Sequence, residues 1–121
     1  MRSLIGSLAA VALLAGCAAQ AAERPDSSTV VYEVTGDASS ADVTLSSPTG
    51  SQQAEVDLPM KNKTGSDGLQ FRFPVGSSLY VSAQNKDAAG TVTCRIRVNG
   101  VVVSENQAVG GYQIATCHGR T

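Results

Sequence analysis

The feature that most constrains this chain is an alternation of apolar and polar residues, with a period of two, that begins at Thr29 and continues through most of the remaining sequence. Successive side chains of an extended strand point to opposite faces, so this alternation predicts half-buried β-strands. The apolar positions fall into these runs: Val30, Tyr32 and Val34; Ala41, Val43 and Leu45; Ala54, Val56 and Leu58; Leu69, Phe71 and Phe73; Leu79, Val81 and Ala83; Val92, Cys94, Ile96 and Val98. No part of 29–121 shows a sustained apolar stripe at the 3.6-residue helical period. An all-β domain is therefore predicted over 29–121.

Turn-forming residues separate these runs. They are Gly36-Asp37, Ser47-Pro48-Thr49-Gly50, Thr64-Gly65-Ser66-Asp67-Gly68, Gly76 and Ala89-Gly90. About seven or eight short antiparallel strands, spaced roughly 8–12 residues apart, predict an immunoglobulin-like β-sandwich with one disulfide. A small β-barrel is the alternative. The chain has no Trp, so the core Trp typical of true immunoglobulin domains is missing.

Asn99-Gly100, between two apolar runs, is the clearest local signal in the sequence. This dipeptide favours a two-residue β-hairpin because a type I′ turn needs positive φ at both central residues. The turn predicts a register with these opposite pairs: Val98 with Val101, Ile96 with Val103, and Cys94 with Glu105. On the last strand, strict alternation would place Tyr112 and Ile114 on one face and Cys117 on the other. A β-bulge between Ile114 and Cys117 would resolve this conflict, but the sequence shows no sign of one.

The N-terminus predicts export. Arg2 is followed by an apolar run from Leu4 to Ala15, which as a helix would rise only about 18 Å and could not cross a hydrocarbon core of about 30 Å. The run ends in Leu14-Ala15-Gly16-Cys17, which resembles the lipobox of bacterial lipoproteins. That resemblance implies a signal peptide over 1–16, removed before an acylated Cys17 that anchors the protein in the bilayer.

Two other interpretations of the N-terminus stay open. Residues 4–22 carry no charge and could remain as an uncleaved anchor, or the chain could be secreted after cleavage behind Ala19 or Ala22. All of these place the domain outside the cytoplasmic membrane. In the lipoprotein interpretation, the small and polar residues 17–28 form a flexible tether with an average reach of roughly 18 Å, and the protein is held at the outer face of the cytoplasmic membrane.

The cysteine count fits this assignment. The chain has three Cys, and assigning Cys17 to lipid leaves Cys94 and Cys117 as an even pair in an oxidising compartment. A disulfide between them would close a loop of about 24 residues and contribute roughly 3–4 kcal/mol of stability. A metal site made of Cys94, Cys117 and His118 is the weaker alternative, because it offers only three ligands and two of these are adjacent. We expect no metal and no cofactor.

An ordered set of segments resembles the MmpS family of small actinobacterial envelope proteins. The segments are Val31-Tyr32-Glu33-Val34-Thr35-Gly36, Ala41-Asp42-Val43-Thr44, Leu58-Pro59, Val81-Ser82-Ala83-Gln84-Asn85, Thr93-Cys94-Arg95-Ile96-Arg97-Val98-Asn99-Gly100 and Cys117. The resemblance covers about 90 residues, with a lipobox where typical members keep a transmembrane helix. It implies an extracytoplasmic β-sandwich that assists an MmpL transporter, of the resistance–nodulation–division class, in exporting lipids or siderophores.

Composition and motifs argue against other classes. The nearly balanced charge, −1 overall, lacks the basic footprint of a nucleic-acid-binding protein. The only His is His118, close to the C-terminus, and no nucleophile-elbow, zinc-protease or phosphate-loop motif occurs, so we expect no enzyme.

We therefore expect an accessory or scaffold for an envelope transporter. The alternative is a lipoprotein that binds a lipid or another envelope protein. Arg95 and Arg97 share an outward strand face next to the Asn99-Gly100 turn, and a basic edge can steer toward acidic loops or lipid head groups. These four residues are the predicted partner contact.

Overall fold

The computed structural model of the chain describes residues 26–121. The predicted signal peptide (1–16), the lipidation site Cys17 and the tether up to residue 25 lie outside the described residues.

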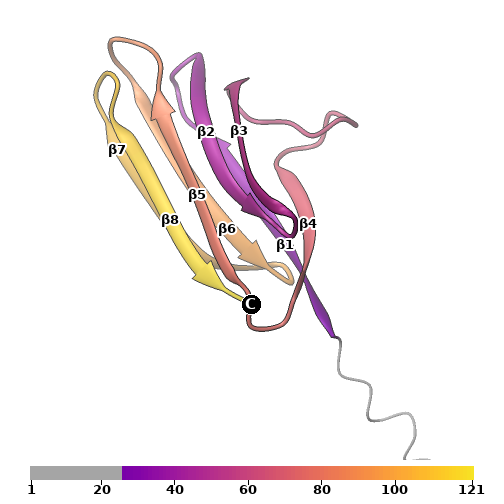
Figure 1. The fold of residues 1–121 in the computed structure, drawn as a ribbon. Coiled ribbons are helices and arrows are strands. Elements are labelled where there is room, and N and C mark those ends of the chain that lie inside the picture. The colour runs from indigo at the N-terminus through magenta and orange to yellow at the C-terminus, as the bar shows by residue number, and fades with distance from the viewer. Residues whose placement is uncertain (1–25) are drawn as a thin grey trace, which may run out of the picture.

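The described chain folds into eight strands and two sheets (Figure 1). The strands are β1 (Ser27–Thr35), β2 (Ser40–Ser47), β3 (Gly50–Asp57), β4 (Leu69–Pro74), β5 (Ser78–Asn85), β6 (Thr91–Val98), β7 (Val101–Val109) and β8 (Ile114–Arg120). The first sheet has the order β4-β1-β6-β7 and the second β3-β2-β5-β8, and every neighbouring pair is antiparallel. The predicted β-sandwich with one disulfide is confirmed.

The core lies between the inner faces of the two sheets. The alternation fixes which apolar residues enter it, because the buried apolar positions of β1, β2, β5 and β6 are the predicted ones. The same faces also bury three polar residues, Ser28, Ser47 and Asn85. Tyr32 is fully buried, lies against the rings of Phe71 and Phe73, and its hydroxyl lies 2.9 Å from Ser46 Oγ. Burial raises the pKa of the Tyr32 phenol above its usual value.

β1 begins two residues earlier than the predicted domain start. Ser27 and Ser28 pair with Pro74 and Phe73 of β4, and Ser28 is buried. These two serines were predicted to belong to the tether. Pairing with β4 satisfies their backbone groups and draws them into the sandwich.

Asn85 organises the end of the sandwich that is opposite the start of β1. Its side chain is fully buried, and Nδ2 donates to the carbonyls of Ala89 (3.0 Å) and Gly110 (3.2 Å). Its Oδ1 accepts a hydrogen bond from the backbone N–H of Asp87 at 2.7 Å. Asn85 thus joins the β5–β6 loop to the β7–β8 loop.

The predicted hairpin register is correct only next to the turn. Val98 pairs with Val101, but a β-bulge at Val103 shifts every later pair by one residue. Ile96 therefore pairs with Ser104 instead of Val103, and Cys94 with Asn106 instead of Glu105. The shift moves Glu105 to the outer face, beside Arg95, and turns Ala108 toward the core. Without it, the Glu105 carboxylate would point inward beside the disulfide.

Two further features differ from the sequence pattern. The conflict between Ile114 and Cys117 is resolved without a bulge, because β8 pairs with β5 in regular register and buries Ala115 and Cys117. Ile114 faces outward instead and is 57% exposed. On β3 the predicted apolar face is poorly covered, with Ala54 exposed and Val56 half-buried, because β3 is an edge strand of its sheet.

Candidate functional site

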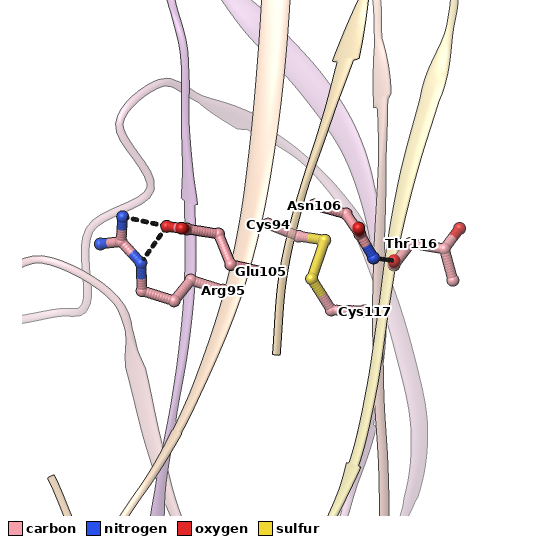
Figure 2. Close-up of a disulfide and its surroundings, with 6 residues drawn as sticks. All are labelled: Cys94, Arg95, Glu105, Asn106, Thr116 and Cys117. Atoms are coloured by element: carbon pink, nitrogen blue, oxygen red, sulfur yellow. Dashed lines mark hydrogen bonds and ion pairs between the residues drawn. A yellow bond between two sulfur atoms is a disulfide. The ribbon is translucent and has the colours of Figure 1, made fainter. Parts of the chain in front are cut away.

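The disulfide connects the two sheets. Cys94 on β6 and Cys117 on β8 are bonded, with their Cα atoms 6.1 Å apart and both side chains fully buried (Figure 2). Beside it, Asn106 Nδ2 on β7 donates to the Thr116 carbonyl of β8 at 2.6 Å. The predicted Cys94–Cys117 pair is confirmed, and together the two links hold β6 and β7 against β8.

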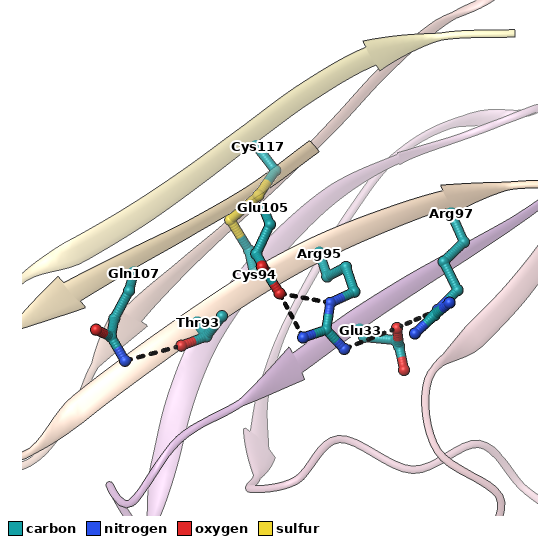
Figure 3. A network of polar contacts seen from close by, with 8 residues as sticks. All are labelled: Glu33, Thr93, Cys94, Arg95, Arg97, Glu105, Gln107 and Cys117. Atoms are coloured by element: carbon teal, nitrogen blue, oxygen red, sulfur yellow. Dashed lines mark hydrogen bonds and ion pairs between the residues drawn. A yellow bond between two sulfur atoms is a disulfide. The ribbon is translucent and has the colours of Figure 1, made fainter. Parts of the chain in front are cut away.

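The two predicted contact arginines lie on an internal strand and are already paired. Glu33 Oε1 on β1 accepts from Arg97 Nε at 2.8 Å and lies 3.5 Å from Arg95 Nη1 (Figure 3). Arg95 Nε also donates to Glu105 Oε2 on β7 at 2.7 Å, and this bond raises the pKa of the Arg95 guanidinium. Two acids thus balance two bases. The expected basic edge is wrong, because β6 lies between β1 and β7 and the arginines face carboxylates on both neighbours.

The Asn99-Gly100 turn has the predicted conformation, with φ of 50° at Asn99 and 85° at Gly100. Its side chain is used within the fold, because Asn99 Oδ1 accepts a hydrogen bond from the Thr29 N–H at 2.9 Å. Asn99 N–H also donates to the Thr29 carbonyl at 2.8 Å. The turn therefore secures the start of β1, and the Oδ1 and backbone N–H of Asn99 are engaged there.

Exposed large apolar residues form two groups on one edge of the sandwich, one beside the Asn99-Gly100 turn and one at the other end of β7. They lie along β7, the β7–β8 loop and the start of β8, and we call them the β7–β8 rim: Val101, Val102, Val103, Val109, Tyr112 and Ile114, each 42–71% exposed. Among the described residues the only large apolar side chain exposed elsewhere is Val75. Six of the seven exposed large apolar side chains thus share one edge, which favours an interaction surface there over singly scattered apolar residues.

The sequence carries a signal for the rim in a run of three valines. Val101, Val102 and Val103 are consecutive, so strand alternation must expose at least one of them whatever the register. Three successive apolar residues on a strand with one solvent-facing side indicate either burial on both faces or an interaction surface. Which of the two applies depends on whether another strand covers β7.

β7 is also the least protected of the edge strands. β3 carries Glu55 and Asp57, β4 carries Arg72 and ends at Pro74, and β8 carries Arg120, all of which discourage pairing with another chain. β7 spans nine residues and its single charge, Glu105, is already paired with Arg95.

A small apolar cleft opens on the opposite side of the sandwich, between β3 and β4. Its volume is about 90 Å³, and its lining consists of Val43, Leu45, Gln52, Gln53, Ala54, Val56, Met60 and Leu69. Met60 is almost fully buried and forms part of the wall. The cleft is smaller than a cavity of about 150 Å³ that accepts a benzene ring.

Neither a metal cluster nor a membrane-spanning helix is found in the described part of the chain. Residues 26–121 contain no group of three or more His, Cys, Asp or Glu side chains placed to hold a metal ion. Nor do they contain a helix long and apolar enough to cross a bilayer. The chain matches no model of a known protein family and no curated protein.

Proposed function

We propose that this protein is a lipid-anchored, extracytoplasmic accessory that docks on a membrane transporter and supports it without chemistry of its own. The observation that carries the proposal is the β7–β8 rim, the one edge of the sandwich that holds six of the seven exposed large apolar side chains of the described residues. The resemblance to MmpS proteins names the class of partner, a resistance–nodulation–division transporter that exports lipids or siderophores. The anchor would be the acylated Cys17.

The polar outer face of the first sheet supports this choice of surface over the predicted arginine contact. Arg95 and Arg97 satisfy Glu33 and Glu105 within the domain, and the Glu33 side chain is only 16% exposed. A partner that recruited these arginines would have to break internal ion pairs and leave a partly buried carboxylate without its counter-ions. The rim can be covered without breaking any described bond.

Confinement makes a modest surface sufficient. A tether with an average reach of roughly 18 Å keeps the domain in a thin layer above the bilayer. The effective concentration toward any protein in the same membrane is then high, so a weak contact can be occupied for most of the time.

The alternative function, binding of a lipid inside the sandwich, has weaker support. The β3–β4 cleft is apolar, but about 90 Å³ is too little for an acyl chain and is open to solvent beside the exposed Ala54. Lipid binding there would require the two sheets to separate, and the Cys94–Cys117 disulfide opposes this.

The test is crosslinking of the full chain in whole cells, followed by mass spectrometry. We compare the unaltered protein with Val102→Lys on the rim and with Val75→Lys, the matched substitution at the exposed valine outside the rim. The unaltered protein and Val75→Lys should crosslink to a transporter, and Val102→Lys should lose about tenfold of that yield. Deleting the gene should lower lipid export. If no transporter is recovered and export is unchanged on deletion, the accessory function is wrong.

A further inference from the structure

The open edge of β7 presents backbone hydrogen-bonding groups at defined positions. Gly110 N–H donates to the Gly90 carbonyl at 2.8 Å, so the residue after β7 faces β6. In an antiparallel ladder, successive residues alternate between facing the neighbouring strand and facing away from it. Ala108 and Asn106 therefore face β6, whereas Val109, Gln107 and Glu105 turn their N–H and C=O groups to the open side. All three of these residues are exposed.

The side chains along this edge have a distinct order. Val101, Val102 and Val103 form an apolar end next to the Asn99-Gly100 turn, and Val109 forms an apolar end roughly 20 Å away. Between them the exposed residues Glu105, Asn106 and Gln107 are polar, and the only charge on the strand is the Glu105 carboxylate. A strand that pairs with this edge would match it with apolar residues at its two ends and a neutral or basic residue opposite Glu105, because like charges on opposite strands repel.

We propose that β7 binds an extended segment of the membrane partner as a fifth strand of the first sheet. This inference rests on the proposed function and deepens it by assigning the mode of docking and the chemistry of the partner segment. Main-chain hydrogen bonds supply affinity, and the alternate side chains supply specificity, as in other cases of strand addition.

A second copy of this chain fits the edge less well. A nine-residue edge is about 30 Å long and one sheet is about 10 Å thick, so pairing two copies edge to edge would bury on the order of 600 Å² in total. Stable dimers bury at least about 1,200 Å². Two-fold antiparallel pairing of β7 strands would also place the two β1 N-terminal ends at opposite ends of the joined sheet, whereas both tethers would have to reach one bilayer.

The experiment separates backbone pairing from side-chain contact at a single position. Gln107→Pro removes an N–H that no described strand uses, and Gln107→Ala removes the same side chain, including its bond to Thr93, but keeps the N–H. Each variant of the full chain also carries a photo-crosslinking residue at Val109, which is 71% exposed. Crosslink yields in whole cells are compared, and thermal melts confirm that both variants are folded. Asn106→Pro, which removes an N–H facing β6, serves as the control that should unfold.

Gln107→Ala should retain most of the crosslink to an extracytoplasmic segment of the transporter. Gln107→Pro should lower the crosslink yield about tenfold, because a carbonyl of the partner strand then lacks the N–H donor of residue 107. Equal yields from the folded Pro and Ala variants would overturn strand addition while leaving the accessory function in place. A crosslink only to a second copy would overturn the choice of partner. A transporter crosslink that comes from other surfaces and never from Val109 would reject the β7 site. If no transporter is recovered from any surface, the accessory function itself fails.

Discussion

Replacing Asn85 should be among the most damaging single changes in this domain, because one buried amide satisfies backbone groups in two loops, β5–β6 and β7–β8, at one end of the sandwich. Asn85→Ala removes the hydrogen bonds to the Ala89 and Gly110 carbonyls and from the Asp87 N–H. At about 1 kcal/mol net for each bond, the loss is roughly 3 kcal/mol. For a domain of about 100 residues this lowers Tm by roughly 15 °C.

Asn85→Asp provides the sharper comparison, since it preserves shape and the acceptor for the Asp87 N–H. In the unaltered protein, Asn85 Nδ2 lies 3.0 Å from the Ala89 carbonyl oxygen and 3.2 Å from the Gly110 carbonyl oxygen. At neutral pH, Asn85→Asp places a carboxylate oxygen at this position. Two attractive contacts become repulsive, so Asn85→Asp should be destabilised at least as much as Asn85→Ala.

Thermal melts followed by circular dichroism, and urea titrations at pH 7, measure both variants. If Asn85→Asp lies within about 0.5 kcal/mol of the unaltered protein, the donor bonds are not what holds these loops, and the reasoning is refuted. Because Gly110 directly follows β7, both variants should also loosen the distal half of the rim, detectable as faster amide hydrogen exchange around Val109.

Three further predictions concern the anchor, the disulfide and the response to acid. Intact mass of the membrane-extracted protein should show loss of residues 1–16 and added acyl chains on Cys17; a mature protein that still begins at residue 1 would restore the uncleaved-anchor interpretation. The double variant Cys94→Ala/Cys117→Ala should lose about 3.5 kcal/mol in urea titrations, the loop-closure value for a separation of 23 residues, and a loss below about 1 kcal/mol would contradict that account. Hydrogen bonds from Thr91 and Ser39 hold the pKa values of Asp37 and Asp87, respectively, below the usual carboxyl range. Their contribution to stability is therefore complete above about pH 5 and is lost as pH falls through the unfolded-state and then the lower folded-state pKa values. Tm should consequently drop on acidification, and the double variant Asp37→Asn/Asp87→Asn should show a smaller drop.

Strand alternation was sufficient to predict the fold class and most of the core. The pattern around Val30, Val43, Val81 and Cys94 assigned the buried faces of β1, β2, β5 and β6 correctly. These strands are internal in their sheets, so a covered face lies beneath each of them. The expectation that Cys17 is acylated left Cys94 and Cys117 as the predicted pair, and the disulfide between them is confirmed.

The predictions failed at the edges. The sequence does not say which strand lies at the edge of a sheet. On an edge strand, residues of the apolar face can remain exposed to solvent, as Ala54 does on β3 and Val103 does on β7. The register between β6 and β7 beyond the Asn99-Gly100 turn also depended on a bulge. The alternation after Val103 does not fix which residues of β7 face the core, and the pairing of Glu105 with Arg95 becomes evident only in the structure.

The sequence by itself determined the alternation, the turn at Asn99-Gly100 and the pairing of the two cysteines, because these depend on local backbone chemistry or on residue counts. Only the tertiary structure decided that Arg95 and Arg97 are neutralised by Glu33 and Glu105, and that the exposed valines of β7 lie on an open edge. Both outcomes follow from strand order. Charge pairing and edge exposure depend on which segments become neighbours in space, and many orders of the same strands satisfy the same local pattern.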